Sequence, residues 1–169
     1  MECLTQERGD ELNKDSSEVM AFIYHNIKHG PYTLSEWKQK LEIDLSEEMD
    51  FIALGEKERE VSSKYAAVKN NLFLAKGAYR AASASKERNY STAYSKVVGG
   101  PSDGKRKAAA TVEQEVMTQI ESSMDALLYA ETLMDFWTTQ ESVVNAKRES
   151  IKNLFWIVKE SHQADRDKP

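Results

Sequence analysis

The stretch TVEQEVMTQIESSMDALLYAETLMDFWTTQESVVNAKRESIKNLFWIVKESH, residues 111–162, decides the fold because it contains no glycine or proline. These two residues are the usual helix breakers, so we expect one uninterrupted helix of about 50 residues. Its inward-facing positions alternate at intervals of four and three, which is typical of a coiled-coil seam. The positions are Val116, Ile120, Ser123, Leu127, Ala130, Met134, Trp137, Glu141, Val144, Arg148, Ile151, Phe155 and Val158.

Other apolar residues widen this seam into a broad stripe. They are Leu128, Leu133, Phe136, Val143, Leu154 and Ile157. One antiparallel partner helix of similar width cannot cover such a stripe, so the pattern predicts self-association. The predicted oligomerisation residues are Leu127, Met134, Trp137, Val144, Ile151 and Phe155.

An earlier segment repeats the same alternation and supplies the partner helix. Its seam consists of Val61, Tyr65, Val68, Leu72, Ala75 and Tyr79. The sequence therefore predicts an all-α fold, a long antiparallel helical hairpin with arms at about 56–88 and 111–162. Residues 89–110 form the expected connector, and Thr111 with Gln114 has the spacing of a capping box at the start of the second arm.

Two shorter helices are expected before the hairpin. They should pack near the end of the hairpin that lies opposite the connector. The first begins near residue 16 and ends at the Gly30–Pro31 pair, and the second begins at the Thr33–Glu36 capping box. Gly55 is expected to mark a kink or break before the first arm. A single helical domain over 16–162 follows, flanked by a disordered tail, 1–15, and by a second tail, 163–169.

Composition places the chain among cytoplasmic proteins. Among its 169 residues Cys3 is the only cysteine, so no intramolecular disulfide can form. The first residues are polar and lack the apolar core of a secretory signal. No run of about 18 apolar residues occurs, which argues against a membrane-spanning helix.

The formal net charge of −5 conceals an uneven distribution. Residues 1–60 carry a net charge of −8, residues 61–110 carry +8, and residues 111–169 carry −5. The whole-chain charge argues against a polyanionic partner, whereas the basic middle segment argues for one.

No pattern in the chain indicates catalysis. Gly99 to Lys105 spells GxxxxGK, but Arg106 stands where a P-loop needs Ser or Thr to hold Mg²⁺, and no buried strand precedes it. His25 and His29 have the i,i+4 spacing of a chelating pair on one helix, yet two surface histidines near a helix C-terminus explain them better. We therefore expect no enzyme activity, no cofactor and no metal.

The basic segment interleaves cations with aromatic residues, as single-stranded nucleic-acid sites do. Cations neutralise phosphates, and aromatic faces stack on bases without selecting a sequence. The candidate binding residues are Lys69, Lys76, Arg80, Lys86, Arg88, Tyr90, Tyr94, Lys105, Arg106 and Lys107. The alternative is that these cations match the acidic N-terminal segment or the acidic last helix, and the pattern alone leaves both interpretations open.

Several short segments resemble the UvsY-like family of T4-type phage recombination mediators. They are Tyr32 with Trp37, LAKGAYR at 74–80, VEQEV at 112–116, LMDFW at 133–137 and AKRESIKNL at 146–154. The resemblance covers residues 32–158 and lies in layout more than identity. This chain departs from the family by an additional N-terminal helix, a longer middle segment and a cation cluster at 105–107.

The resemblance implies a small helical oligomer that binds single-stranded DNA and loads a recombinase. It implies DNA contacts for Lys76 and Arg80, an oligomerising role for the last helix and, if the chain is phage-encoded, a location in the host cytoplasm. We accordingly expect an oligomeric, non-enzymatic accessory protein of recombination, repair or replication that binds single-stranded DNA or RNA. The alternative is a protein-binding coiled-coil module, such as a phage-encoded inhibitor or assembly adaptor, that uses the acidic residues of 36–60.

Overall fold

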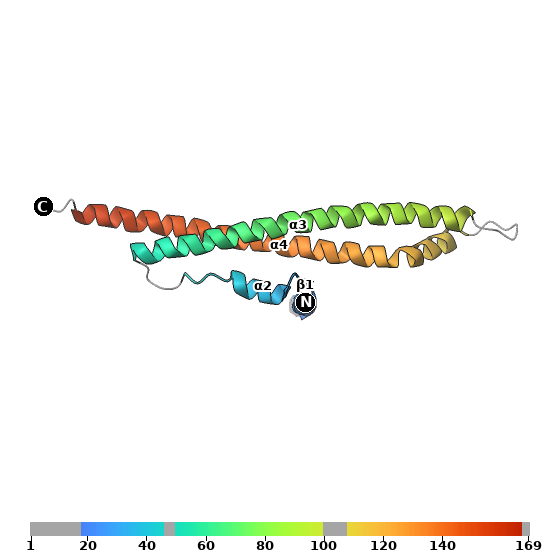
Figure 1. The fold of residues 1–169 in the computed structure, drawn as a ribbon, viewed down its shortest axis with the longest axis horizontal. Helices are drawn as coiled ribbons and strands as arrows, with labels where there is room; N and C mark the ends of the chain where they lie inside the picture. Colours follow the sequence, from blue (N-terminus) through green and yellow to red (C-terminus); the bar gives the residue numbers. More distant parts are fainter. Residues whose placement is uncertain (1–17, 46–49, 100–107, 167–169) are drawn as a thin grey trace, which may run out of the picture. The chain divides into compact units, whose positions relative to one another are not determined.

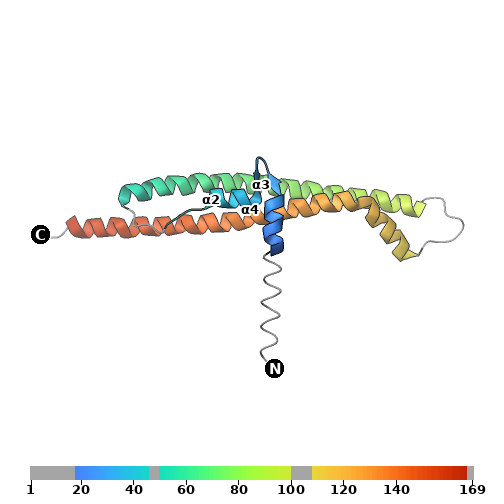
Figure 2. The same cartoon turned by 90° about the horizontal axis from the view of Figure 1, so that it is seen from below.

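A computed structural model describes residues 18–45, 50–99 and 108–166 of the chain. Two long helices dominate it, α3 (Phe51–Gly99) and α4 (Ala109–Arg166), which run side by side as an antiparallel hairpin (Figures 1 and 2). The predicted all-α hairpin is confirmed. The chain divides into two units: unit 1 comprises Met1–Lys64 and Val143–Pro169, and unit 2 comprises Tyr65–Ser142.

Unit 2 is built on the predicted seam. Val68, Leu72 and Ala75 of α3 are buried, as are several seam residues of α4, among them Val116, Ile120, Ala130 and Trp137. Two cross-helix contacts show the antiparallel register, Lys69 with Glu141 and Asn89 with Ser123. The four-three alternation therefore places part of the core of this unit, and Leu133 and Phe136, each one position before a seam residue, are buried as well.

The first arm is longer than its pattern suggests. Residues 89–99, which we assigned to the connector, continue α3 as helix to Gly99. Ala93 and Val97 on this segment pack with Val116 and Ile120 in a small buried cluster. The segment contains few large apolar residues. Its helical state therefore depends on α4, which covers the small side chains Ala93 and Val97. Of the expected connector, residues 100–107 lie outside the described part of the chain.

The start of α4 also differs from expectation. The helix begins at Ala109, and the amides of Thr111 and Val112 donate hydrogen bonds to the Ala108 carbonyl. Thr111 thus lies inside the first turn, and the predicted capping box at Thr111 and Gln114 is wrong.

The described part of unit 1 begins with helical residues 18–26, so this helix ends before the predicted boundary at Gly30–Pro31. A pair of short antiparallel strands that the sequence did not predict follows it. Strand β1 (Lys28–His29) pairs with β2 (Tyr32–Thr33). Gly30 turns the chain between them with φ of 63°, a left-handed conformation that favours glycine. Because His29 lies in β1, the prediction that His25 and His29 both lie near the C-terminus of one helix is wrong.

Helix α2 (Leu34–Leu41) begins at the predicted capping box, which is confirmed. The Thr33 amide donates to Glu36 Oε2 at 2.7 Å, and the Glu36 amide donates to Thr33 Oγ1 at 3.2 Å. The Thr33 hydrogen bonds hold the pKa of the Glu36 carboxyl below its usual value. The indole of Trp37 donates to the His29 carbonyl at 2.8 Å, so it fastens α2 to the strand pair.

Helix α3 begins at Phe51, before the expected break at Gly55, which lies inside the helix. Asp50 caps the helix, since its Oδ1 accepts from the Ala53 amide at 2.8 Å. In the same unit Phe51 packs against Phe155 of α4, with ring centroids 4.5 Å apart. Leu54, Val61, Val144 and Ile151 are buried, which extends the seam through this unit.

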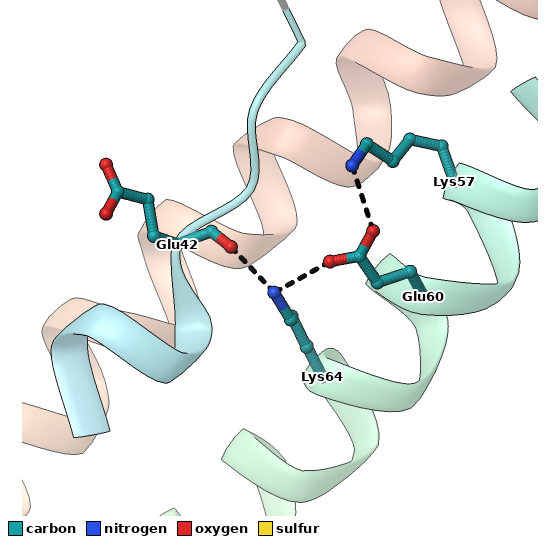
Figure 3. A network of polar contacts seen from close by, with 4 residues as sticks. All are labelled: Glu42, Lys57, Glu60 and Lys64. Atoms are coloured by element: carbon teal, nitrogen blue, oxygen red, sulfur yellow. Dashed lines mark hydrogen bonds and ion pairs between the residues drawn. The ribbon is translucent and has the colours of Figure 1, made fainter. Parts of the chain in front are cut away.

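A polar network in unit 1 joins the first turns of α3 to the end of α2 (Figure 3). Glu60 accepts from Lys57 Nζ at 3.1 Å and from Lys64 Nζ at 2.8 Å. Lys64 Nζ also donates to the Glu42 carbonyl at 2.6 Å. These hydrogen bonds, that of Lys64 foremost, lower the pKa of the Glu60 carboxyl from its ordinary value of 4.5.

Because the pKa of Glu60 is lowered in the folded chain, its network adds to the free energy of unfolding at neutral pH, and this contribution disappears when acid protonates the carboxylate. Its contribution is present above the ordinary pKa and is lost as the pH falls through the pKa of the folded carboxyl. We expect Glu60→Gln to reduce the free energy of unfolding at neutral pH by about 0.5 kcal/mol, allowing for solvent screening. Urea melts across pH check this, with exposed Glu56→Gln as the control. A Glu60→Gln deficit that persists unchanged in acid would contradict the assignment.

Candidate nucleic-acid interface

Three of the predicted cations gather on one side of α3 in unit 2. Lys69, Phe73, Lys76 and Arg80, which we call the basic row, each follow a seam residue by one position. Their spacing of four, three and four residues places them on a single helical face. All four side chains are exposed, and Phe73 is 76% exposed.

Lys69 differs from the other cations of the row because it already has a partner. Its Nζ lies 2.5 Å from Glu141 Oε1 of α4 and 5.8 Å from the centre of the Tyr65 ring. The hydrogen bond and the charge of Glu141 raise the pKa of Lys69. Lys76 and Arg80 form no ion pair with any residue that the structure describes. These two cations are therefore the ones available to a ligand.

The predicted tyrosines form an aromatic surface further along α3. Tyr90 and Tyr94 are 40% and 47% exposed, and their rings stack with centroids 6.3 Å apart and planes inclined by 17°. Of the nearby cations, Lys86 is half-buried, while Arg88 is exposed and donates from Nε to the Ala84 carbonyl at 3.2 Å. Lys105, Arg106 and Lys107 lie outside the described residues.

Phe73 is not among the predicted binding residues, yet it is the most exposed aromatic residue in the described part of unit 2. The signal was available, because Phe73 directly follows the seam residue Leu72 and therefore cannot share its buried position. It lies four residues after Lys69 and three before Lys76, so cations flank it on the same face.

The half of α4 in unit 2 carries the opposite charge. Residues 109–142 contain seven carboxylates and no Lys or Arg, whereas residues 65–99 of α3 contain six cations and one carboxylate. Part of this charge lies on what we call the acidic row, Glu121, Met124, Leu128, Glu131 and Asp135, all exposed. The bond from Lys69 to Glu141 shows that charge matching with the last helix accounts for one cation of the basic row.

The residues predicted to oligomerise are covered within a single chain. Trp137, Val144 and Ile151 are buried, and Leu127, Met134 and Phe155 are half-buried. A second apolar surface remains in unit 1, where Trp156 and Ile157 are 63% and 62% exposed. Trp156 lines a groove of about 300 Å³ together with Glu58, Ile151, Lys152, Phe155 and Lys159.

Some acidic residues of 36–60, the alternative functional surface, are engaged in local structure, whereas Glu56 and Glu58 are exposed and form no ion pair with a described residue. Asp50 caps α3, Glu36 closes the α2 capping box and Glu60 bridges two lysines. Glu47 and Glu48 lie outside the described residues. The described part of the chain brings no three His, Cys, Asp or Glu residues together as metal ligands.

Comparison with protein-family models, with curated proteins and with solved structures finds no match. The resemblance to recombination mediators therefore stays a prediction. Among the helices that the structure describes, none has a stretch long and apolar enough to cross a bilayer.

Proposed function

We propose that this chain is a non-enzymatic accessory protein that binds single-stranded nucleic acid through the basic row. The observation that carries the proposal is Phe73, a phenylalanine ring left 76% exposed between cations on one helical face. An exposed phenylalanine costs solvation free energy, and a base stacked on it would remove that cost.

Each side chain has a distinct part in this proposal. Lys76 and Arg80 neutralise phosphates and release their counterions, while the Phe73 ring stacks on a base. The Tyr90–Tyr94 pair extends the stacking surface along α3. Because none of these groups distinguishes one base from another, binding is expected to be tolerant of sequence, as an accessory protein of recombination, repair or replication requires.

Several copies would act together on one strand and hand it to a partner such as a recombinase, as the resemblance to recombination mediators implies. Leu154, Trp156 and Ile157 of α4 offer an exposed apolar surface for joining copies, separate from the basic row. Trp156 is the expected centre of such a contact because buried tryptophans dominate many protein interfaces.

Two substitutions should weaken binding in different ways. Lys76→Ala/Arg80→Ala removes two phosphate contacts, so the negative slope of log affinity against log salt should become shallower by about 1.4. Phe73→Ala removes stacking, so affinity should fall by about 1 to 3 kcal/mol with the slope unchanged. Fluorescence anisotropy of a labelled oligothymidylate between about 50 and 200 mM salt measures both quantities.

Matched controls separate these effects from general damage. Leu74→Ala removes a side chain that is 52% exposed on another face of α3, and Lys38→Ala/Lys40→Ala removes the same charge from α2. Both should bind as the wild type does. Absence of wild-type binding at the lowest salt, or equal losses in the controls, would refute the proposal.

A protein-binding coiled-coil module is the second candidate function. The observation in its favour is the acidic half of α4, in which Glu121, Glu131 and Asp135 form no ion pair with a described residue. If oligothymidylate does not bind, a protein with a basic face becomes the expected partner of this surface.

A further inference from the structure

We propose that a second copy of this chain packs face to face on unit 2, with the basic row of each copy lying on the acidic row of the other. This self-pairing goes beyond the proposed function. One consequence of it, competition with a nucleic-acid strand for the basic row, rests on the proposed function.

Both rows lie on the same side of the hairpin. Each member of the basic row follows a seam residue of α3 by one position, and each member of the acidic row follows a seam residue of α4 by one position. Two antiparallel helices are related by a two-fold axis perpendicular to both, so equal offsets from the seam point to the same side. The hairpin therefore presents a basic strip and an acidic strip next to each other.

This face is self-complementary in charge. A two-fold rotation about an axis parallel to the helices places α3 of one copy over α4 of the other, and the same contact forms twice. Lys76 and Arg80 then meet Glu131 and Asp135, none of which forms an ion pair within the described chain. The alternative pairing of α3 on α3 would oppose like charges, which disfavours it.

The face also carries the apolar area that association needs. Phe73 and Leu128 are 76% and 63% exposed, and Met124 of the acidic row is 36% exposed. In the proposed dimer the two hairpins form a four-helix bundle that buries these side chains between them. A nucleic-acid strand on the basic row would leave Leu128 and the acidic row uncovered, whereas a second copy covers both strips.

Charge reversal provides the test. Variant A, Lys76→Glu/Arg80→Glu, and variant B, Glu131→Lys/Asp135→Lys, each place like charges across the dimer. We expect each to raise the dimer dissociation constant at least about tenfold over the wild type in sedimentation velocity at low salt. An equimolar mixture of A and B restores opposite charges at both contacts, so it should form a mixed dimer about as tightly as the wild type. Salt should weaken the wild-type dimer.

Circular dichroism of A and B alone shows whether each hairpin still folds. Leu128→Glu, an exposed position, provides a second test that leaves the basic row intact, and it should also weaken the dimer. A wild type that is monomeric at low salt, a dimer indifferent to these variants, or a mixture of folded A and B that does not associate would overturn the proposal.

Oligothymidylate added to the wild type separates the two proposals. If the strand binds and disperses the dimer, both stand. If it does not bind while A and B still rescue each other, the self-pairing stands and the nucleic-acid proposal fails. If the strand binds the intact dimer through the basic row, so that Lys76→Ala/Arg80→Ala weakens binding while the dimer persists, the dimer does not use that row and the self-pairing is overturned.

Discussion

Replacing Trp137 with alanine is expected to lower the free energy of unfolding by about 3 to 5 kcal/mol. Trp137 is fully buried at a seam position of α4, with its ring 5.1 Å from that of Phe136 in an edge-to-face contact. Removing it deletes a large apolar side chain and leaves a cavity that rigid helices cannot close. Urea melts followed by circular dichroism measure the loss.

Trp156→Ala is the matched control for this prediction. The same substitution is made on the same helix, but Trp156 is 63% exposed and contributes little to the core. It should change the stability of the single chain by less than about 0.5 kcal/mol. Equal losses for the two tryptophans would contradict the burial on which the hairpin core depends.

Ser91→Pro is expected to reduce stability by about 3 kcal/mol. The position is exposed and lies in the part of α3 that the sequence assigned to the connector. Proline removes an amide donor and clashes with the preceding turn, so the cluster of Ala93 and Val97 with Val116 and Ile120 should loosen.

Ser91→Ala keeps the backbone donor and should leave stability within about 0.5 kcal/mol of the wild type. Hydrogen exchange of the amides in 91–99 gives a local readout, with protection in the wild type and its loss in the proline variant. Tolerance of proline at this position would mean that α3 ends earlier than Gly99.

The hairpin seam could be predicted from sequence because its signal is repeated many times. Leu72 and Ala75 on α3, and Val144 and Ile151 on α4, all fall on the four-three alternation and are buried. The end of α3 could not be predicted in this way. Its buried residues, Ala93 and Val97, are small and follow a polar segment, so their helical state depends on packing against α4.

The candidate interface was predictable in composition and less so in arrangement. The segment charges predict the cations, and the seam register predicts the exposure of Phe73. That Lys69 is held by Glu141 depends on how the two helices pair. The Gly30 turn shows a different limit. A Gly–Pro pair predicts that a helix ends. It does not predict that the residues on its two sides, His29 and Tyr32, pair as strands.

The antiparallel register has a consequence for how the chain folds. Asn89 meets Ser123 across 34 residues of chain, whereas Lys69 meets Glu141 across 72 residues. Each doubling of a loop adds about 0.6 kcal/mol to the entropy cost of closing it, so contacts between residues close together in sequence cost the least entropy to form. We expect the cluster of Ala93, Val97, Val116 and Ile120 to form first. Contacts between residues further apart in sequence should follow in order, and the contact of Phe51 with Phe155 should form last.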